Sequence, residues 1–214
     1  PFGCNVALKN YSGDAIVRID AHATIPNDFI SKNVKILQSG EKVSGGKRPN
    51  IIDEQTPWKN MLLAAEQSMF GSSIAAYRNA DKPRYVSSIF HGMYSREVYD
   101  TVGFYDTRLA RTEDNDMSER ISKAGYKLHY DPEIVSYQHT RSTLKGMLRQ
   151  KYLNGFWIGR TMGINPHCFS VYHFVPFVFV LGILLTSILA VCGHPMLAVL
   201  IWSAYVLLIL ACTV

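Results

Sequence analysis

The last quarter of this chain carries no charged side chain, which limits how it can fold. From residue 161 to residue 214, a stretch of 54 residues, there is no Asp, Glu, Lys or Arg. Two apolar runs, residues 174–191 and 196–214, fill most of it and are separated by Gly193-His194-Pro195. Each run is long enough to cross the apolar core of a bilayer, and soluble core helices rarely run so far without charge. We therefore expect a transmembrane helical hairpin over residues 169–214.

Positive charge is concentrated just before these apolar runs. Of the 22 Lys and Arg, 17 lie in residues 1–133 and balance the 17 Asp and Glu there, so the net charge of +5 is local. The other five lie within 20 residues: Arg141, Lys145, Arg149, Lys151 and Arg160. Because aliphatic and aromatic side chains alternate with them, residues 141–168 are predicted to form an amphipathic segment at a membrane interface. This pattern favours membrane lipid, and not nucleic acid, as the partner.

The first 140 residues alternate between helical and strand patterns. A strand pattern over residues 15–19 follows a short helical one over 4–11, and a second helix and strand follow up to residue 47. Further on, helical spacing is found at residues 58–70, 95–102 and from 113 to Gly125. Strand-like runs lie at residues 88–94, 126–130 and 134–137. Residues 71–84 are polar and are expected to form an exposed excursion. The order predicts an α/β sheet with crossover helices.

The first strand ends in two side chains that can bind metal. Asp20 and His22 are two residues apart, so in an extended segment both lie on one face. In open α/β sheets, ligands bind beyond the carboxyl ends of the strands. The pair therefore indicates a site for a phosphate-bound metal, although a strand followed by a polar loop would have the same residues.

A second candidate segment is Thr112-Glu113-Asp114, at the start of a predicted helix. Such residues often cap the helix or complement its dipole, and on that interpretation they only stabilise it. On the functional interpretation, Asp114 is a general base beside an acceptor hydroxyl. His139 is either a hydrogen-bonded surface histidine or a metal ligand, and Gly92 would let the backbone approach a ligand closely.

Five motifs taken together resemble a family 2 glycosyltransferase of the bacterial exopolysaccharide type, as in succinoglycan biosynthesis. In chain order they are Ile-Val-Arg-Ile-Asp-Ala-His, Gly-Gly-Lys-Arg-Pro, Phe-His-Gly-Met-Tyr, Arg-Thr-Glu-Asp-Asn-Asp and Ser-Tyr-Gln-His-Thr-Arg. The resemblance covers about residues 1–175 and implies a GT-A fold, a Rossmann-like nucleotide-diphospho-sugar transferase domain over residues 1–140. It also implies that the family's first strand-helix units, which hold the nucleotide base, would precede Pro1, so we expect an N-terminally truncated domain.

The resemblance also implies roles for individual residues. Asp20 and His22 stand where the family has Asp-x-Asp, which binds a divalent metal and the donor diphosphate, and His139 matches its C-terminal metal ligand. Asp114 matches the catalytic base, with Glu113 beside it at the substrate. Because an imidazole replaces the second carboxylate, Mn²⁺ is favoured over Mg²⁺.

One departure from the resembled family concerns processivity. The Gln-x-x-Arg-Trp signature of processive synthases is missing, and Arg149-Gln150-Lys151-Tyr152 resembles it only loosely. We therefore expect addition of a single sugar, with Arg149 as a substrate-binding residue and a processive polysaccharide synthase as the alternative.

The leading hypothesis is an inverting glycosyltransferase of cell-surface glycan synthesis. It would move a sugar from a nucleoside-diphosphate sugar, expected to be UDP-linked, to a saccharide on a polyprenyl diphosphate. Because basic residues precede the first apolar run, the catalytic domain would face the cytoplasm at the bacterial inner membrane. A non-catalytic membrane scaffold that binds carbohydrate or a partner is the alternative from another class.

Overall fold

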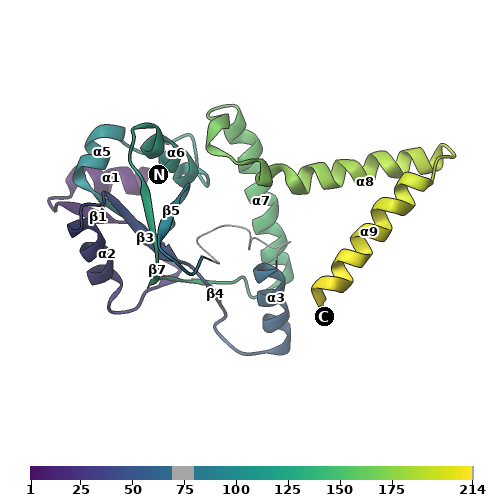
Figure 1. Ribbon diagram of the computed structural model, residues 1–214, viewed down its shortest axis with the longest axis horizontal. Helices are drawn as coiled ribbons and strands as arrows, with labels where there is room; N and C mark the ends of the chain where they lie inside the picture. Colours follow the sequence, from purple (N-terminus) through teal and green to yellow (C-terminus); the bar gives the residue numbers. More distant parts are fainter. Residues whose placement is uncertain (69–79, 214) are drawn as a thin grey trace. The chain divides into compact units, whose positions relative to one another are not determined.

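The computed structural model describes residues 1–68 and 80–213. It divides into two compact units, Pro1–Cys168 and Phe169–Val214 (Figure 1). The first unit is a mixed α/β domain, which agrees with the predicted fold class, and the second is helical.

A five-stranded sheet forms the centre of the first unit. Its strands follow the order β1-β6-β3-β7-β5, and only β3 and β7 pair in parallel. The strands are β1 (Ala15–Val17), β3 (Val43–Lys47), β5 (Arg84–Val86), β6 (Met93–Ser95) and β7 (Leu128–Val135). At Gly46 an added Cβ would lie 2.0 Å from the carbonyl oxygen of Ile134, so a glycine here lets β3 and β7 approach closely.

Helices surround this sheet and complete the core (Figure 1). They are α1 (Phe2–Asn10), α2 (Phe29–Gln38), α5 (Arg96–Val102) and α6 (Glu113–Lys123). The hydrophobic core is a cluster of buried side chains that several helices, strands and loops contribute. Its members are Leu8, Val43, Ile89, Tyr94, Val98, Tyr99, Tyr105, Met117, Ile121 and Leu128. Burying this cluster holds the starts of α6 and β6 against the end of β1, which positions the candidate site.

A smaller three-stranded sheet lies in the same unit, in the order β2-β8-β4. Its strands are β2 (Ala23–Thr24), β4 (Asn50–Ile51) and β8 (Tyr137–His139). Two helices follow the strands: α3 (Pro57–Gln67) and α7 (Leu144–Met162). Both begin at a threonine whose hydroxyl accepts a backbone N–H, Thr56 from Lys59 and Thr143 from Gly146, the usual N-cap contact.

Several predicted element boundaries change. The predicted strand 88–94 is reduced to β6, because residues 87–92 bend and place His91 in the left-handed region. The two predicted strands after residue 126 become the longer β7 and the short β8. The predicted excursion at 71–84 falls largely outside the described residues, and its end forms β5.

The second unit is a helical hairpin of α8 (Val175–Val191) and α9 (Met196–Thr213), after a short turn η2 (Val171–Phe174). Gly193, with φ of 90°, makes the connecting turn, and Phe179 packs on Tyr205 with ring centroids 4.9 Å apart. Among the described residues, no helix is long and apolar enough to cross a membrane. Helices α8 and α9 pack against each other, and the predicted transmembrane hairpin is not supported.

Candidate active site

Arg18 connects the two segments that the sequence singled out. It follows β1, and its Nη2 donates a hydrogen bond to Glu113 Oε1 at 2.8 Å. The same nitrogen lies 3.7 Å from Asp20 Oδ1. Its guanidinium also faces the ring of Tyr105, 5.5 Å from the centroid. The carboxyl end of β1 and the start of α6 therefore form one charged cluster, here called the Arg18 cluster: Arg18, Asp20, His91, Glu113 and Asp114.

Asp20 is ionised throughout the physiological range. The imidazole of His91 beside it, and then the guanidinium of Arg18, lower its pKa to about 2, against the opposing effect of burial. Its side chain keeps 30% of its surface exposed. A permanently charged carboxylate with an accessible face is suited to bind a cation.

His91 is a member of the cluster that sequence reasoning missed. It is buried, and its φ of 50° is rare for a residue other than glycine. Its Nδ1 lies 2.8 Å from Ser136 Oγ, and its Nε2 lies 3.4 Å from Asp20 Oδ2. Nε2 has no hydrogen-bond partner among the described residues. Only its place in the Phe-His-Gly-Met-Tyr motif could have drawn attention to it.

Glu113 is more than a helix-dipole residue. Its side chain is only 8% exposed, and while Oε1 accepts the hydrogen bond from Arg18, Oε2 is buried without a hydrogen-bond partner among the described residues. Thr112 does not cap α6 with its side chain; its hydroxyl instead lies 2.6 Å from the hydroxyl of Thr161, after most of α7. Helix capping and the helix dipole therefore do not explain the contacts that Thr112 and Glu113 make.

Asp114 is a half-buried carboxyl in the first turn of α6. Burial and the neighbouring Glu113 raise its pKa to about 6, while Arg18 and Arg48 act in the opposite direction. Its Oδ1 accepts a hydrogen bond from the backbone N–H of Asn115 at 2.9 Å. A carboxylate with a pKa near neutrality is a stronger base than an ordinary aspartate and is still mostly ionised at pH 7.

Arg48 is a second residue that sequence reasoning did not single out. It lies in the Gly-Gly-Lys-Arg-Pro motif after β3, and only 6% of it is exposed. Its guanidinium lies 3.8 Å from the centroid of the Phe90 ring, and its charge lowers the pKa of Asp114. Arg48 therefore supplies positive charge on the side of the cluster next to the candidate base.

The predicted metal ligands are not brought together. His22 is exposed in the turn after Asp20. His139 lies in β8, where its Nε2 is 3.1 Å from Thr24 Oγ1 and its Nδ1 pairs with Asp53. In the part of the chain that the structure describes, no three His, Cys, Asp or Glu side chains form a metal-binding group. A pair does fit a divalent cation: Asp20 Oδ2 and His91 Nε2, the second an orphaned buried nitrogen.

Gly92 and Arg149 remain predictions as substrate-binding residues. The Gly92 carbonyl accepts the backbone N–H of Arg18 at 3.2 Å, and an added Cβ would lie 2.8 Å from Ile89 Cγ2. Close packing within the protein therefore already explains the glycine. Arg149 is exposed on α7.

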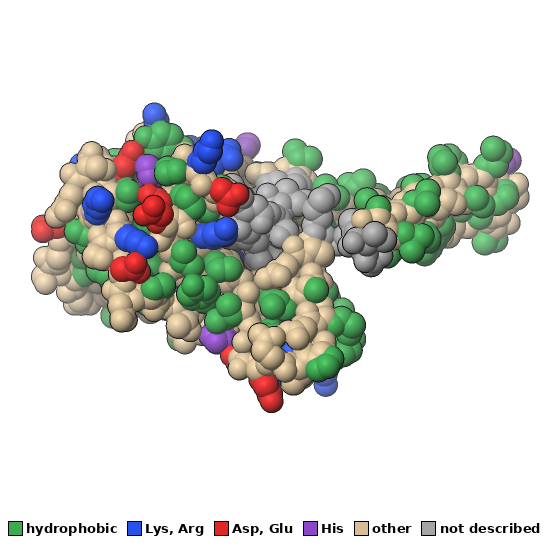
Figure 2. Space-filling view, turned by 60° about the horizontal axis from the view of Figure 1, so that its bottom comes forward, with side chains coloured by type: hydrophobic (Ala, Val, Ile, Leu, Met, Phe, Trp, Pro, Cys, Tyr) green, Lys and Arg blue, Asp and Glu red, His purple; other side chains and the backbone are tan. Residues whose placement is uncertain are grey.

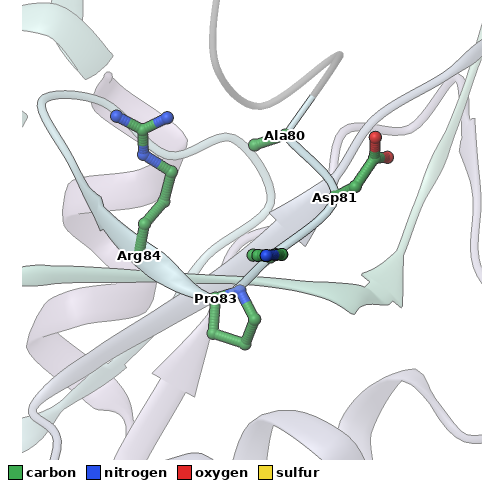
Figure 3. Close-up of a pocket in the computed structure, with 5 residues that line it drawn as sticks. Ala80, Asp81, Pro83 and Arg84 are labelled. Atoms are coloured by element: carbon green, nitrogen blue, oxygen red, sulfur yellow. The ribbon is translucent and has the colours of Figure 1, made fainter.

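A surface pocket lies at the start of β5 (Figure 3). It is lined by Ala80, Asp81, Lys82, Pro83 and Arg84. Lys47 Nζ lies 3.6 Å from Asp81 Oδ1, and the side chains of Asp81 and Arg84 lie well apart and do not meet (Figure 3). No member of the Arg18 cluster lines this pocket, so we do not assign the chemistry to it.

Comparison with known proteins decides the family. A family model described as glycosyl transferase family group 2 matches residues 15–214. This chain belongs to that family. The predicted assignment to family 2 is confirmed, and the matched residues include every member of the Arg18 cluster.

Two relatives of this family group 2 chain have described roles. One is the dolichyl N-acetyl-alpha-D-glucosaminyl phosphate 3-beta-D-2,3-diacetamido-2,3-dideoxy-beta-D-glucuronosyltransferase of Methanococcus voltae, 26% identical over 197 residues, which are 88% of this chain and 60% of the relative. The other is the succinoglycan biosynthesis protein ExoA of Rhizobium meliloti (strain 1021), 24% identical over 166 residues, 76% of this chain and 48% of the relative. The predicted resemblance to exopolysaccharide enzymes is confirmed, and the chain spans between about half and three fifths of the length of these relatives.

Proposed function

We propose that this chain carries the acceptor-side catalytic half of an inverting glycosyltransferase. The donor would be a nucleoside-diphosphate sugar, UDP-linked, and the acceptor a lipid-linked saccharide of a cell-surface glycan or exopolysaccharide. The names of the two relatives, one acting on a dolichyl-linked sugar and one in succinoglycan biosynthesis, support this class of acceptor. The observation that carries the proposal is the position of Asp114, a half-buried carboxyl of raised pKa beside the Arg18–Glu113 ion pair.

In this proposal Asp114 acts on the acceptor hydroxyl. One of its carboxylate oxygens takes the hydroxyl proton as the acceptor oxygen forms its bond to the anomeric carbon. The bond between that carbon and the diphosphate oxygen breaks on the opposite face, which inverts the configuration. The pKa of about 6 places the base close to the working pH, where proton transfer is most effective.

The neighbours of Asp114 set its charge and position. Glu113 raises its pKa by repulsion, and Arg18 holds Glu113 in place with the 2.8 Å hydrogen bond. Arg48 places positive charge beside Asp114, close to where a diphosphate leaving group would carry negative charge. A divalent metal, Mn²⁺ or Mg²⁺, held by Asp20 and His91, would neutralise that leaving group when bound.

The test is Asp114→Asn, which keeps the shape of the side chain and removes its basicity. We expect transfer to fall by about 10²-fold or more, with nucleotide-sugar binding nearly unchanged. Asp28→Asn is the matched control, because Asp28 is an exposed carboxylate at the start of α2 paired only with Lys32 among the described residues. Transfer by purified Asp114→Asn at the level of the control variant would refute the assignment of the base.

We further propose that the protein works at the cytoplasmic face of the bacterial inner membrane, bound to lipid. One face of α7 exposes apolar side chains at every fourth residue: Leu144, Leu148, Tyr152 and Phe156. Lys145 and Arg149 are exposed beside them, and α7 contains no acidic residue. An apolar stripe flanked by positive charge is suited to a bilayer that contains anionic lipid.

The hairpin supports the same proposal. Most of the large apolar side chains of α8 and α9 are exposed, among them Val178, Leu184 and Leu200 (Figure 2). Large contiguous apolar surfaces on soluble monomers are rare and mark interaction sites. The lipid-linked acceptor would then meet the enzyme in the bilayer that both occupy.

Vesicle flotation tests the membrane proposal. We expect the protein to float with vesicles that contain anionic phosphatidylglycerol and less with vesicles of neutral lipid alone. Replacing both Lys145 and Arg149 by Gln should weaken binding to the anionic vesicles about thirtyfold, since each basic residue contributes about 1 kcal/mol near such a surface. Lys9→Gln and Lys35→Gln together, which remove the same charge from α1 and α2, form the control. Equal losses in both double variants would contradict a specific role for α7.

A further inference from the structure

We propose that His91 and Asp20 together form a divalent-cation site, and that His91, not His22 or His139, provides the imidazole ligand. The proposal deepens the proposed function, because the cation would be the one that accompanies the donor diphosphate. It rests on the position, burial and unmet hydrogen bonding of His91, a residue to which no role has been assigned by motif.

The geometry of the pair is the first argument. His91 Nε2 and Asp20 Oδ2 are 3.4 Å apart. If each of these two atoms lay about 2.1 Å from one ion, a typical ligand distance, the angle between them at the ion would be about 108°. This angle lies between the right angle of an octahedron and the tetrahedral angle, so the two atoms can serve as neighbouring ligands of one divalent ion.

The state of the imidazole is the second argument. Only 5% of His91 is exposed, and its Nε2 faces the Asp20 carboxylate at 3.4 Å without a well-aligned hydrogen bond to any described residue. Buried nitrogen atoms without a partner are rare and costly, and they call for an explanation such as an ion. Ser136 Oγ, 2.8 Å from Nδ1, is placed to accept the other ring N–H, which would leave the Nε2 lone pair directed toward the cation. Metal-bound histidines usually have such a partner on the second nitrogen.

The backbone and the local charge are further arguments. His91 is the only non-glycine residue with positive φ in the described part of the chain. Strain of this kind persists where the surrounding structure requires it and is concentrated at functional sites. The nearby Arg18 would repel a cation, but Glu113 neutralises it at 2.8 Å. With Asp20 and the ionised Asp114, the Arg18 cluster therefore has net negative charge around the pair.

His139 is a natural control, because it too pairs with a carboxylate but both its ring nitrogens are engaged. Nδ1 contacts Asp53 and Nε2 lies 3.1 Å from Thr24 Oγ1. Neither nitrogen is free to bind an ion without losing a contact. We therefore expect His139→Ala to leave cation binding unchanged.

Electron paramagnetic resonance of Mn²⁺ tests the proposal. The purified protein is titrated with Mn²⁺, alone and with UDP, and pulsed measurements detect nitrogen coupled to the bound ion. The wild type should show one imidazole nitrogen, and His91→Ala should lose that coupling and bind Mn²⁺ about tenfold or more weakly. Asp20→Asn is the second variant: it should also weaken binding while keeping the nitrogen coupling. Its side chain is 30% exposed and more accessible than that of His91, so misfolding is less of a concern.

Each outcome decides the matter. Loss of nitrogen coupling in folded His91→Ala, with His22→Ala and His139→Ala like the wild type, would establish the site. Coupling that persists in His91→Ala and disappears in His22→Ala or His139→Ala would overturn it. So would a wild type without nitrogen coupling or without Mn²⁺ binding. Because these measurements do not depend on sugar transfer, their failure is separate from failure of Asp114 as the base.

Discussion

Two regions of the first unit carry the residues predicted for the site, and they treat charge differently. The Arg18 cluster buries charge and leaves it incompletely paired: Glu113 is 8% exposed with one unpartnered oxygen, and His91 has an unpartnered nitrogen among the described residues. The small sheet around His139 keeps its ionic pair near solvent, with Asp53 65% exposed. Buried and unsatisfied polar atoms are costly to a fold, so they indicate function more strongly than the exposed and satisfied pair does.

The largest expected effect comes from removing the residue at the centre of the Arg18 cluster. Arg18→Ala would leave Glu113 buried without its partner, so we expect the free energy of unfolding to fall by about 3 kcal/mol. Urea denaturation followed by circular dichroism measures this. The matched control is Arg108→Ala, which removes an exposed partner of Asp106 and should cost about 1 kcal/mol or less. Equal losses in the two variants would mean that the buried and exposed ion pairs do not differ.

A smaller effect is expected from pH. The raised pKa of Asp114, about 6, means that the base is ionised above that pH and protonated below it. The transfer rate should therefore be nearly constant above pH 7 and should fall about tenfold for each unit below pH 6. Asp20, with its pKa lowered to about 2, stays ionised over the same range and does not contribute. A rate that is flat down to pH 4.5, measured with stable protein, would argue against Asp114 as the base.

The smallest effect is expected at the exposed histidine pair. His139→Ala removes a contact with Asp53 that is largely open to solvent, so the free energy of unfolding should fall by about 1 kcal/mol or less. Thermal unfolding at pH 7 measures the change, with His194→Ala in the hairpin turn as a control. A loss as large as that of Arg18→Ala would remove the contrast between the two regions.

Sequence reasoning predicted local structure better than contacts. The spacing of apolar residues predicted α3, α5 and α6 to within a few residues, because helical periodicity is a local property. It also selected Asp20, Glu113 and Asp114. The structure joins Asp20 and Glu113 through Arg18, and the charge of Arg18 also acts on Asp114. Arg18 lies within the predicted strand 15–19 and carries no local sign of its role. The 95 residues that separate it from Glu113 hide their contact from a local sequence pattern.

The remaining differences have the same physical origin. His91 and Ser136 are 45 residues apart, and neither shows a local signal of their contact. The family resemblance grouped His139 with Asp20 as a metal ligand. In the structure, β8 pairs with β2 and β4 in a separate sheet, and His139 contacts Asp53. The strands that form one sheet are determined by pairing between distant segments. The periodicity of a single segment carries no information about that pairing.

The bond between Thr112 and Thr161 has a consequence for the choice of acceptor. It ties the start of α6, where Asp114 lies, to the far end of a helix whose opposite end begins at Leu144. With α7 seated on a bilayer as proposed, this tie fixes how high the base stands above the lipid surface. The enzyme would then select an acceptor hydroxyl by its distance above the lipid surface as well as by its stereochemistry. That distance depends on how many sugars already separate the hydroxyl from its lipid.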